Sequence, residues 1–417
     1  MLKKLLVFTC FLIGISAVSQ STIKTMFYNL LEFPEALPGN RSTILQNILN
    51  EYEPDIFMVC ELQSEEGADE ILDVSLNDGG SNYSRAPYFE NQSGFADLQQ
   101  LIFFRTSKFT LISSEIITTS VRDINHYTLQ ANTADGDSDP LLIEVFVTHL
   151  KASTGGENEM KRLQMVQAFT NKLEELDPNS FVIFSGDLNL YTSTELAYQE
   201  LLDPTNAITM VDPIDTPGLW HSNANFTSVH TQSTRTNSGP FGAGAGGGMD
   251  DRFDFILVSE NMLANPSLRY IENSYKAFGN NGNCFNKSIS DNDCNGTFSQ
   301  ALRDNLFSMS DHLPVTMELE TDKEIILNNV SFTENLTTIS IENTLAKTFL
   351  RIKVHNQVQV LDINKLTIYN TLGQKVLDYK LNSSADIIQI PVSHLANGMY
   401  YIKPNTGHKP LKFIKTS

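Results

Sequence analysis

Side chains that can bind a metal ion or exchange a proton follow six separate apolar segments of this sequence. Glu61 ends the run "DIFMVCEL", and Asp187 and Asn189 come at the end of "FVIFSGDLNL". Carboxylate and amide oxygens suit hard cations such as Mg²⁺, and histidine exchanges protons near neutral pH. The full set of candidates is Asn29, Glu61, His149, Asp187, Asn189, Asp254, Asp311 and His312.

Each of these residues alone has an ordinary structural explanation. Glu61 could form a salt bridge or cap a helix, and His149 could be a hydrogen-bonded core histidine. "GDLN" could be an Asx turn and "SDH" a loop cap. The strand ends of a layered α/β domain nevertheless converge on one rim, where residues from distant segments meet. We therefore interpret the eight residues as one site.

The elements that would position this site alternate between strand-like and helix-like patterns. Apolar spacing of three and four residues predicts helices over residues 40–52 and 158–176. Together the pattern predicts an α/β layered core from Ile23 to about Glu320. The predicted strands cover residues 25–33, 55–62, 98–104, 141–150, 181–190, 252–259 and 313–320.

The order of these motifs resembles the endonuclease/exonuclease/phosphatase superfamily, which includes pancreatic-type deoxyribonucleases, abasic-site endonucleases, inositol polyphosphate 5-phosphatases and neutral sphingomyelinases. An Asn strand, a Glu strand, a His strand, "GDLN", "RFD" before an apolar strand and "SDHLPV" follow in that order. The resemblance implies a four-layered αββα sandwich, in which two packed mixed sheets have helices outside. It also implies metal-assisted hydrolysis of a phosphate ester.

The resemblance assigns a role to each candidate. Asn29 and Glu61 would hold Mg²⁺ or Mn²⁺, with Ca²⁺ as a possible auxiliary ion and Asp311 as a further ligand or catalytic group. Asp187 would orient or deprotonate the attacking water, although His312 is an alternative general base.

The remaining assignments concern the phosphate. Asn189 would help to hold the water and the phosphate, and His149 would donate to the phosphate. Asp254 would fix the tautomer of His312 and favour its cationic form. Arg122 either contacts the phosphate or is a surface arginine paired with Asp123 or another carboxylate.

One position departs from the pattern of the superfamily. Relatives carry a second polar ligand two residues after the first Asn, whereas this chain has Leu31 there, which predicts a metal site with fewer protein ligands. The Gly-rich segment 238–248 is read either as a linker or as a mobile rim of the active site.

The beginning of the chain has the pattern of a secretory signal peptide. Lys3 and Lys4 precede an apolar run and the small residues of "SAVSQ", which predicts cleavage after Ser19. A membrane anchor is the alternative, but the run is shorter than the roughly 20 residues that span a bilayer, and we expect no transmembrane segment.

Export would leave three cysteines, because Cys10 would be removed with the signal peptide. Cys284 and Cys294 lie in one polar loop, where a disulfide would close a short ring and contribute roughly 3 kcal/mol. We expect Cys60 to stay reduced and buried. The net charge of −20 argues against a broad basic face that binds nucleic acid, but not against phosphate chemistry around a cation.

Short strand-like segments replace the helical patterns after Glu324. "LTIYNTLGQKV", "IPVSHLANGMYYIKP" and "KPLKFIKTS" resemble the C-terminal sorting domain that Bacteroidetes proteins use for type IX secretion. The domains expected are a signal peptide (1–19), a catalytic domain (20–322) and a small C-terminal β-sandwich that meets the secretion machinery (323–417). The chain would be secreted or attached to the cell surface, as a monomer.

The function expected from these observations is a secreted metal-dependent phosphodiesterase, most simply an extracellular nuclease with nucleic acid as substrate. A sphingomyelinase-like phospholipid phosphodiesterase or another phosphatase of the superfamily is the first alternative. A surface binding protein on an inactive catalytic fold is the second, but it predicts missing catalytic groups, and every principal position is filled.

Overall fold

The computed structural model describes residues 21–94, 97–238, 241–326, 338–355, 365–371, 373–380, 387–404 and 411–417. They fall into two compact units, one within residues 1–329 and one within residues 330–417. The predicted signal peptide lies outside the described residues, and each unit is treated separately.

The first unit contains two mixed β-sheets. One sheet has the order β11-β13-β1-β2-β4-β3, with β12 also paired to β13, and the other has the order β5-β6-β7-β8-β10-β9. The strands are β1 (Ser21–Phe33), β2 (Ile56–Leu62), β3 (Tyr83–Arg85), β4 (Gln99–Arg105), β5 (Phe109–Ile117), β6 (Ile124–Ala131), β7 (Leu142–His149), β8 (Phe181–Asp187), β9 (Met210–Val211), β10 (Asp254–Ser259), β11 (Arg269–Tyr270), β12 (Lys276–Ala277) and β13 (Val315–Thr321).

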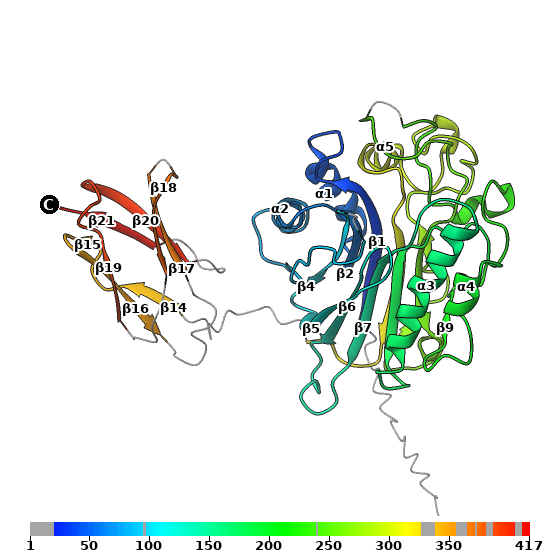
Figure 1. The fold of residues 1–417 in the computed structure, drawn as a ribbon, viewed down its shortest axis with the longest axis horizontal. Coiled ribbons are helices and arrows are strands. Elements are labelled where there is room, and N and C mark those ends of the chain that lie inside the picture. The colour runs from blue at the N-terminus through cyan, green and yellow to red at the C-terminus, as the bar shows by residue number, and fades with distance from the viewer. Residues whose placement is uncertain are drawn as a thin grey trace, which may run out of the picture. The chain divides into compact units, whose positions relative to one another are not determined.

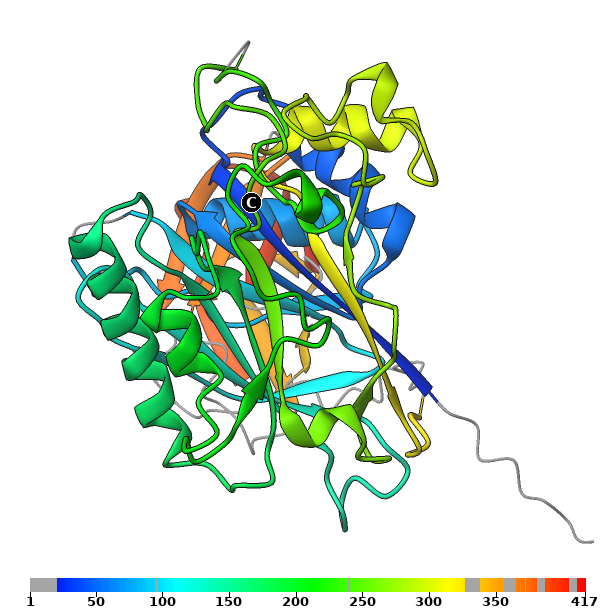
Figure 2. The same cartoon turned by 90° about the vertical axis from the view of Figure 1, so that its right-hand side faces the viewer.

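Helices cover the outer faces of both sheets. α1, α2 and α5 lie on the side of β1 and β2, whereas α3 and α4 pack on the opposite side of the unit (Figures 1 and 2). The layers are therefore helix, sheet, sheet and helix, which confirms the expected αββα sandwich. The helices are α1 (Arg41–Tyr52), α2 (Glu65–Glu70), the π-helical turn η1 (Ile71–Leu76), α3 (Gly156–Leu173), α4 (Leu196–Leu201), the 3₁₀ turns η2 (Ala224–Val229), η4 (Glu260–Leu263) and η5 (Asn292–Cys294), and α5 (Gln300–Met309).

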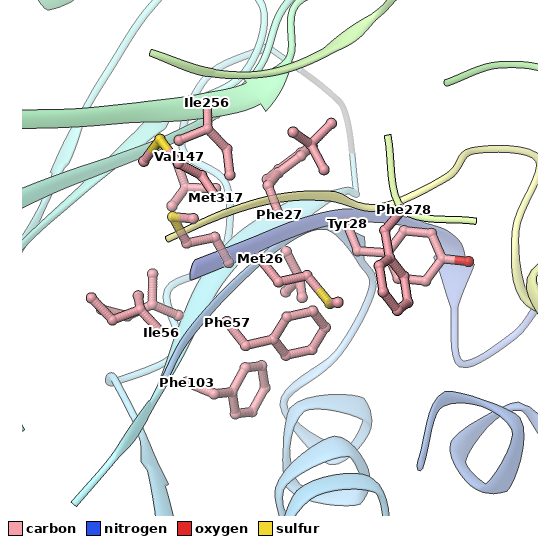
Figure 3. Close-up of a cluster of buried hydrophobic side chains, with 14 of the residues drawn as sticks. Met26, Phe27, Tyr28, Ile56, Phe57, Phe103, Val147, Ile256, Phe278 and Met317 are labelled. Atoms are coloured by element: carbon pink, nitrogen blue, oxygen red, sulfur yellow. The ribbon is translucent and has the colours of Figure 1, made fainter. Parts of the chain in front are cut away.

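Both faces of the central strands are buried, as their nearly continuous apolar sequences predict. The largest core lies between the sheets and under α1, and Figure 3 shows Met26, Phe27, Phe57, Val147 and Ile256 in it. A second core joins α3 and α4 to the other face of the second sheet. These two cores hold the strand ends in fixed positions.

A buried ion pair anchors the start of β10. The Arg252 guanidinium donates to both carboxylate oxygens of Asp212 at 2.8 and 3.0 Å, and both side chains are almost completely buried. The guanidinium also stacks 4.2 Å from the centre of the Phe255 ring. Arg252, the first residue of the "RFD" motif, therefore fixes the strand that carries Asp254.

The second unit is a small two-sheet β structure. Its sheets have the orders β14-β16-β19 and β15-β21-β20-β17-β18, with Ile352, Ile368, Ile390 and Phe413 in one core. The strands are β14 (Thr338–Ile341), β15 (Leu345–Ala346), β16 (Phe349–His355), β17 (Lys365–Asn370), β18 (Lys375–Lys380), β19 (Ile387–Pro391), β20 (Gly398–Pro404) and β21 (Leu411–Lys415). No helix among the described residues is long and apolar enough to cross a membrane.

Candidate active site

Strand register brings the candidate residues together. In the second sheet, Asp187 at the end of β8 pairs with His149 at the end of β7 and with Asp254 at the start of β10. In the first sheet, Asn29 of β1 pairs with Cys60, the residue before Glu61. Because the sheets pack face to face, the two groups lie at one rim.

Asp187 lies at the centre of this group. Its Oδ2 accepts from Asn29 Nδ2 at 3.0 Å, and lies 3.4 Å from His149 Nε2 and 3.6 Å from His312 Nε2. Its Oδ1 accepts from the backbone N–H of Asn189 at 3.1 Å. Three residues from separate segments, together with Asn189 of its own segment, therefore surround one buried carboxylate.

Glu61 approaches the same point from the first sheet. Asn29 Nδ2 donates to Glu61 Oε1 at 2.9 Å, so one amide bridges Glu61 and Asp187. Asn29 Oδ1 accepts from the N–H of Leu31 at 2.9 Å, which leaves a second lone pair of this oxygen for a cation. Glu61 has φ of +58°, a left-handed conformation that costs a non-glycine residue of the order of 1 kcal/mol and occurs often at functional sites.

His312 is held by the Asp and Ser residues around it. Its Nδ1 lies 2.7 Å from Asp254 Oδ2, which is the pairing expected from the sequence, and its backbone N–H donates to Ser310 Oγ. Burial lowers the pKa of His312, but the charges of Asp254 and Asp187 outweigh burial and raise it well above its usual value. Because Asp254 holds Nδ1, the opposite ring nitrogen, Nε2, faces Asp187.

Burial also shifts the pKa of three other groups. It raises the pKa of Asp187 to about 7, with the charges of Asp254 and Glu61 adding to the shift. Burial and then the charge of Asp311 raise the pKa of Glu61. Burial and then Arg122 lower the pKa of His149 well below its usual value, so His149 is neutral at pH 7. Perturbed pKa values of this kind are common at catalytic sites.

Asp311 lies beside the group without a hydrogen bond to the other predicted ligands. Its Oδ2 accepts from the backbone N–H of Ala245 at 2.6 Å and from Gln232 Nε2 at 3.2 Å. The same Gln232 nitrogen lies 2.7 Å from His312 Nε2. The sequence analysis did not identify Gln232, because "HTQSTRT" has neither strand periodicity nor a known catalytic spacing.

Arg122 and Asn189 lie next to His149. Arg122 Nη1 donates to the backbone oxygens of His149 and Leu150 at 3.2 and 3.1 Å, and its Nε is buried without a hydrogen-bond partner. Asp123, the suggested ion-pair partner, instead accepts from Ser93 and from the backbone of Gln92. Arg122 has no ion pair with a carboxylate of the described residues. Asn189 Nδ2 donates to the oxygen of Leu150 at 3.4 Å.

The donor set fits a hard divalent cation. The half-buried Glu61 and the buried Asp187 and Asp311 have no lysine or arginine within ion-pair distance among the described residues. Asp311 Oδ1 and Asp254 Oδ1 are buried without a hydrogen-bond partner. Uncompensated buried carboxylates are costly, and a cation with oxygen ligands would offset this cost.

The described cysteines form one disulfide and leave one buried thiol. Cys284 and Cys294 form a disulfide with a Cα–Cα distance of 5.1 Å, and Cys60 is reduced and completely buried. Cys60 thus packs in the core while Glu61, the next residue, turns toward the rim.

Comparison with known proteins gives one family match and several similar structures. Residues 346–415 match the model of the secretion system C-terminal sorting domain, which confirms the sorting domain expected from the sequence and indicates export. No curated protein matches the chain.

Three of the similar structures have low identity to this chain. An endonuclease/exonuclease/phosphatase family protein from Bacteroides thetaiotaomicron is 15% identical, with a TM-score of 0.46, over 73% of this chain and 96% of that one. TDP2 from D. rerio, complexed with single strand DNA product, is 17% identical, with a TM-score of 0.47, over 72% of this chain and 100% of that one. A mannosyl-6-phosphatase from Bacteroides thetaiotaomicron is 15% identical with a TM-score of 0.44, over 71% and 99%.

These likenesses are too distant to assign an activity. Residues 346–415 match the model of the secretion system C-terminal sorting domain, and the similar structures include an endonuclease/exonuclease/phosphatase family protein.

Proposed function

We propose that this protein is a secreted, divalent-metal-dependent phosphodiesterase that cleaves extracellular nucleic acid. The observation that carries the proposal is the convergence of Asn29, His149 and His312 on Asp187 at one buried rim. Metal-assisted hydrolysis needs a cation site, a proton acceptor and donors to the phosphate oxygens in contact with one another.

Asn29, Glu61 and Asp311 would hold Mg²⁺ or Mn²⁺ through their oxygens, while the Asn29 amide nitrogen bridges Glu61 to Asp187. When bound, the cation would polarise the phosphate and offset its negative charge. This assignment follows from oxygen ligands without a protein counter-ion.

The other residues would act on the water and the phosphate. Asp187 has a pKa raised to about 7 by burial, so its Oδ2 can take a proton from the attacking water near neutral pH. His312, oriented by Asp254, would donate from Nε2 to a phosphate oxygen. His149, Asn189 and the unpaired guanidinium of Arg122 would provide further donors on the same side.

A bound phosphodiester would also contact Gln232. Its amide nitrogen, a donor to Asp311, lies 2.7 Å from His312 Nε2, the atom assigned to the phosphate, so the amide would have to move aside or donate to the phosphate as well.

The second unit would serve delivery. Residues 346–415 match a sorting domain, and its described residues form their own hydrophobic core. We assign it to the type IX secretion machinery, with export following removal of residues 1–19. The monomeric state belongs to the same proposal, as does a catalytic domain from residue 20, which the backbone hydrogen bond of Ile326 extends beyond the expected limit of residue 322.

The test is an activity panel on purified protein. Single- and double-stranded DNA, RNA, sphingomyelin, a sugar phosphate and bis-p-nitrophenyl phosphate are incubated with Mg²⁺, Mn²⁺ or EDTA. We expect cleavage of nucleic acid and of the small diester that EDTA abolishes. Turnover of sphingomyelin or the sugar phosphate alone would assign a lipid phosphodiesterase or a phosphatase instead. Binding without turnover of any ester would identify a binding protein.

A further inference from the structure

The Gly-rich loop, defined here as Phe241–Gly248, contacts the candidate metal site directly. The backbone N–H of Ala245 donates to Asp311 Oδ2 at 2.6 Å, and a Cβ built on Gly244 would lie 2.9 Å from Asp311 Cγ and 3.0 Å from Leu31 Cδ2. The loop therefore approaches the Asp311 carboxyl so closely that only glycine fits at position 244.

The loop is anchored along its length. Ser233 Oγ donates to the oxygen of Ala245 at 2.8 Å, and Arg235 Nη1 donates to the oxygen of Ala243 at 3.3 Å. The Arg235 guanidinium also stacks on the Phe241 ring at 4.5 Å from its centre. A flexible linker would not form these contacts, so the loop is better described as an attached part of the active-site rim.

Gln232 supports the same oxygen from the other direction. Its Nε2 donates to Asp311 Oδ2 at 3.2 Å, while its backbone is fixed by hydrogen bonds to and from Asp251. Asp311 Oδ2 therefore has two donors, whereas Asp311 Oδ1 is buried and has none. The carboxyl group is held so that one oxygen faces the protein and the other stays available.

We propose that the Gly-rich loop and Gln232 are positioning elements that fix Asp311 so that its Oδ1 is presented to the cation of the active site. The inference rests on the proposed function for the identity of that ligand. It assigns a role to a Gly-rich segment and to a residue that the motifs of the sequence do not include. Groups that orient a metal ligand typically contribute 10–100-fold to metal affinity.

Two glycines of the loop provide a matched comparison. Gly242 and Gly244 have φ of +72° and +86°, so alanine strains the backbone similarly at both. A Cβ at Gly242 would have no neighbour within 4 Å, whereas a Cβ at Gly244 would strike Asp311. The pair separates displacement of the carboxyl group from loop strain.

The experiment compares Gly244→Ala with Gly242→Ala in the full chain. Mn²⁺ affinity is measured by isothermal titration, and kcat and KM are measured on bis-p-nitrophenyl phosphate. We expect Gly244→Ala to weaken Mn²⁺ binding by about 10-fold or more and to lower kcat with little change in KM. Gly242→Ala should stay within about twofold of the wild type. Equal Mn²⁺ affinities for the two variants would overturn the inference.

A second pair tests Gln232 if Gly244→Ala does not fold. Gln232→Met keeps the length of the side chain but removes the donor, and Gln232→Glu places a like charge against Asp311. We expect both to weaken Mn²⁺ binding, Gln232→Glu more strongly, with unchanged thermal unfolding midpoints. Wild-type Mn²⁺ affinity in both would refute the positioning role while leaving the proposed hydrolysis intact. A wild-type protein that binds no Mn²⁺ and cleaves no ester would refute both proposals.

Discussion

Removing one partner of the buried Arg252–Asp212 pair should destabilise the first unit strongly. In Asp212→Asn, the Arg252 guanidinium stays buried among Trp220, Phe255 and Tyr275 without its carboxylate. Breaking a buried pair in this way costs about 3–5 kcal/mol, because the remaining charge is uncompensated. With a urea slope of about 3 kcal/mol per molar, the midpoint should fall by roughly 1–1.7 M.

The assay is urea unfolding of the wild type, of Asp212→Asn, of the single variants Arg252→Met and Asp212→Leu, and of the double variant Arg252→Met/Asp212→Leu. The double variant removes both charges and should recover most of the lost stability, since apolar replacements of buried pairs are often tolerated. Its kcat should also recover relative to the single variants, because removing both charges leaves no uncompensated charge to displace β10 and Asp254. A single variant that loses less than about 1 kcal/mol would refute the reasoning.

Four further outcomes are expected. Replacing Cys284 and Cys294 together by serine should lower the unfolding free energy by about 2.7 kcal/mol, from the chain-entropy relation for a separation of 10 residues; equal urea midpoints would contradict it. Mass spectrometry after iodoacetamide should find Cys60 alkylated only in denaturant, and labelling of the native protein would contradict its burial. Truncation after Ile326 should leave kcat/KM unchanged for DNA and for a small diester but abolish secretion in the native host, and selective loss on DNA would show that the tail contacts substrate. Glu61→Gln should weaken Mn²⁺ binding about 10-fold or more without loss of folding, as an unchanged far-ultraviolet circular dichroism spectrum would check.

The truncation point comes from the structure rather than from the composition of the sequence. Composition places the end of the catalytic domain near residue 322. In the structure, Ile325 is buried. The backbone N–H of Ala134 donates to the oxygen of Glu324, and the backbone N–H of Ile326 donates to the oxygen of Asn132. The segment beyond β13 therefore belongs to the packing of the first unit up to at least Ile326.

The sequence predicted that the candidates lie at or near strand ends, because each adjoins an apolar run of the length of a buried strand. β7 and β8 end at His149 and Asp187, and β10 begins at Asp254. Glu61 is the last residue but one of β2, whereas β1 continues from Asn29 to Phe33. The helix α5 was missed, since its apolar residues Leu302, Leu306 and Met309 cover fewer than three turns. Short helices give weak periodic signals.

Contacts made by loops could not be predicted in the same way. Gln232 reaches Asp311 and His312 across roughly 80 residues of sequence, and the loop carrying Ala245 contacts Asp311 through its backbone. Every residue except proline has a backbone N–H, so the residue type does not show which N–H contacts a carboxylate. A single glutamine likewise forms no periodic pattern that would predict its position. Glycine content signalled only that the loop had unusual conformations, and not that Gly244 lies against a carboxyl group.

The most direct test of the account is the turnover of Asp187→Asn on bis-p-nitrophenyl phosphate with Mg²⁺ at neutral pH. Asp177→Asn serves as the control, because Asp177 is an exposed carboxylate that accepts only from Asn179. We predict that Asp187→Asn binds the diester and unfolds like the wild type, but has a kcat lower by about 100-fold or more. Asp177→Asn should turn over at the wild-type rate. A kcat for Asp187→Asn equal to that of Asp177→Asn would contradict the assignment of the active site.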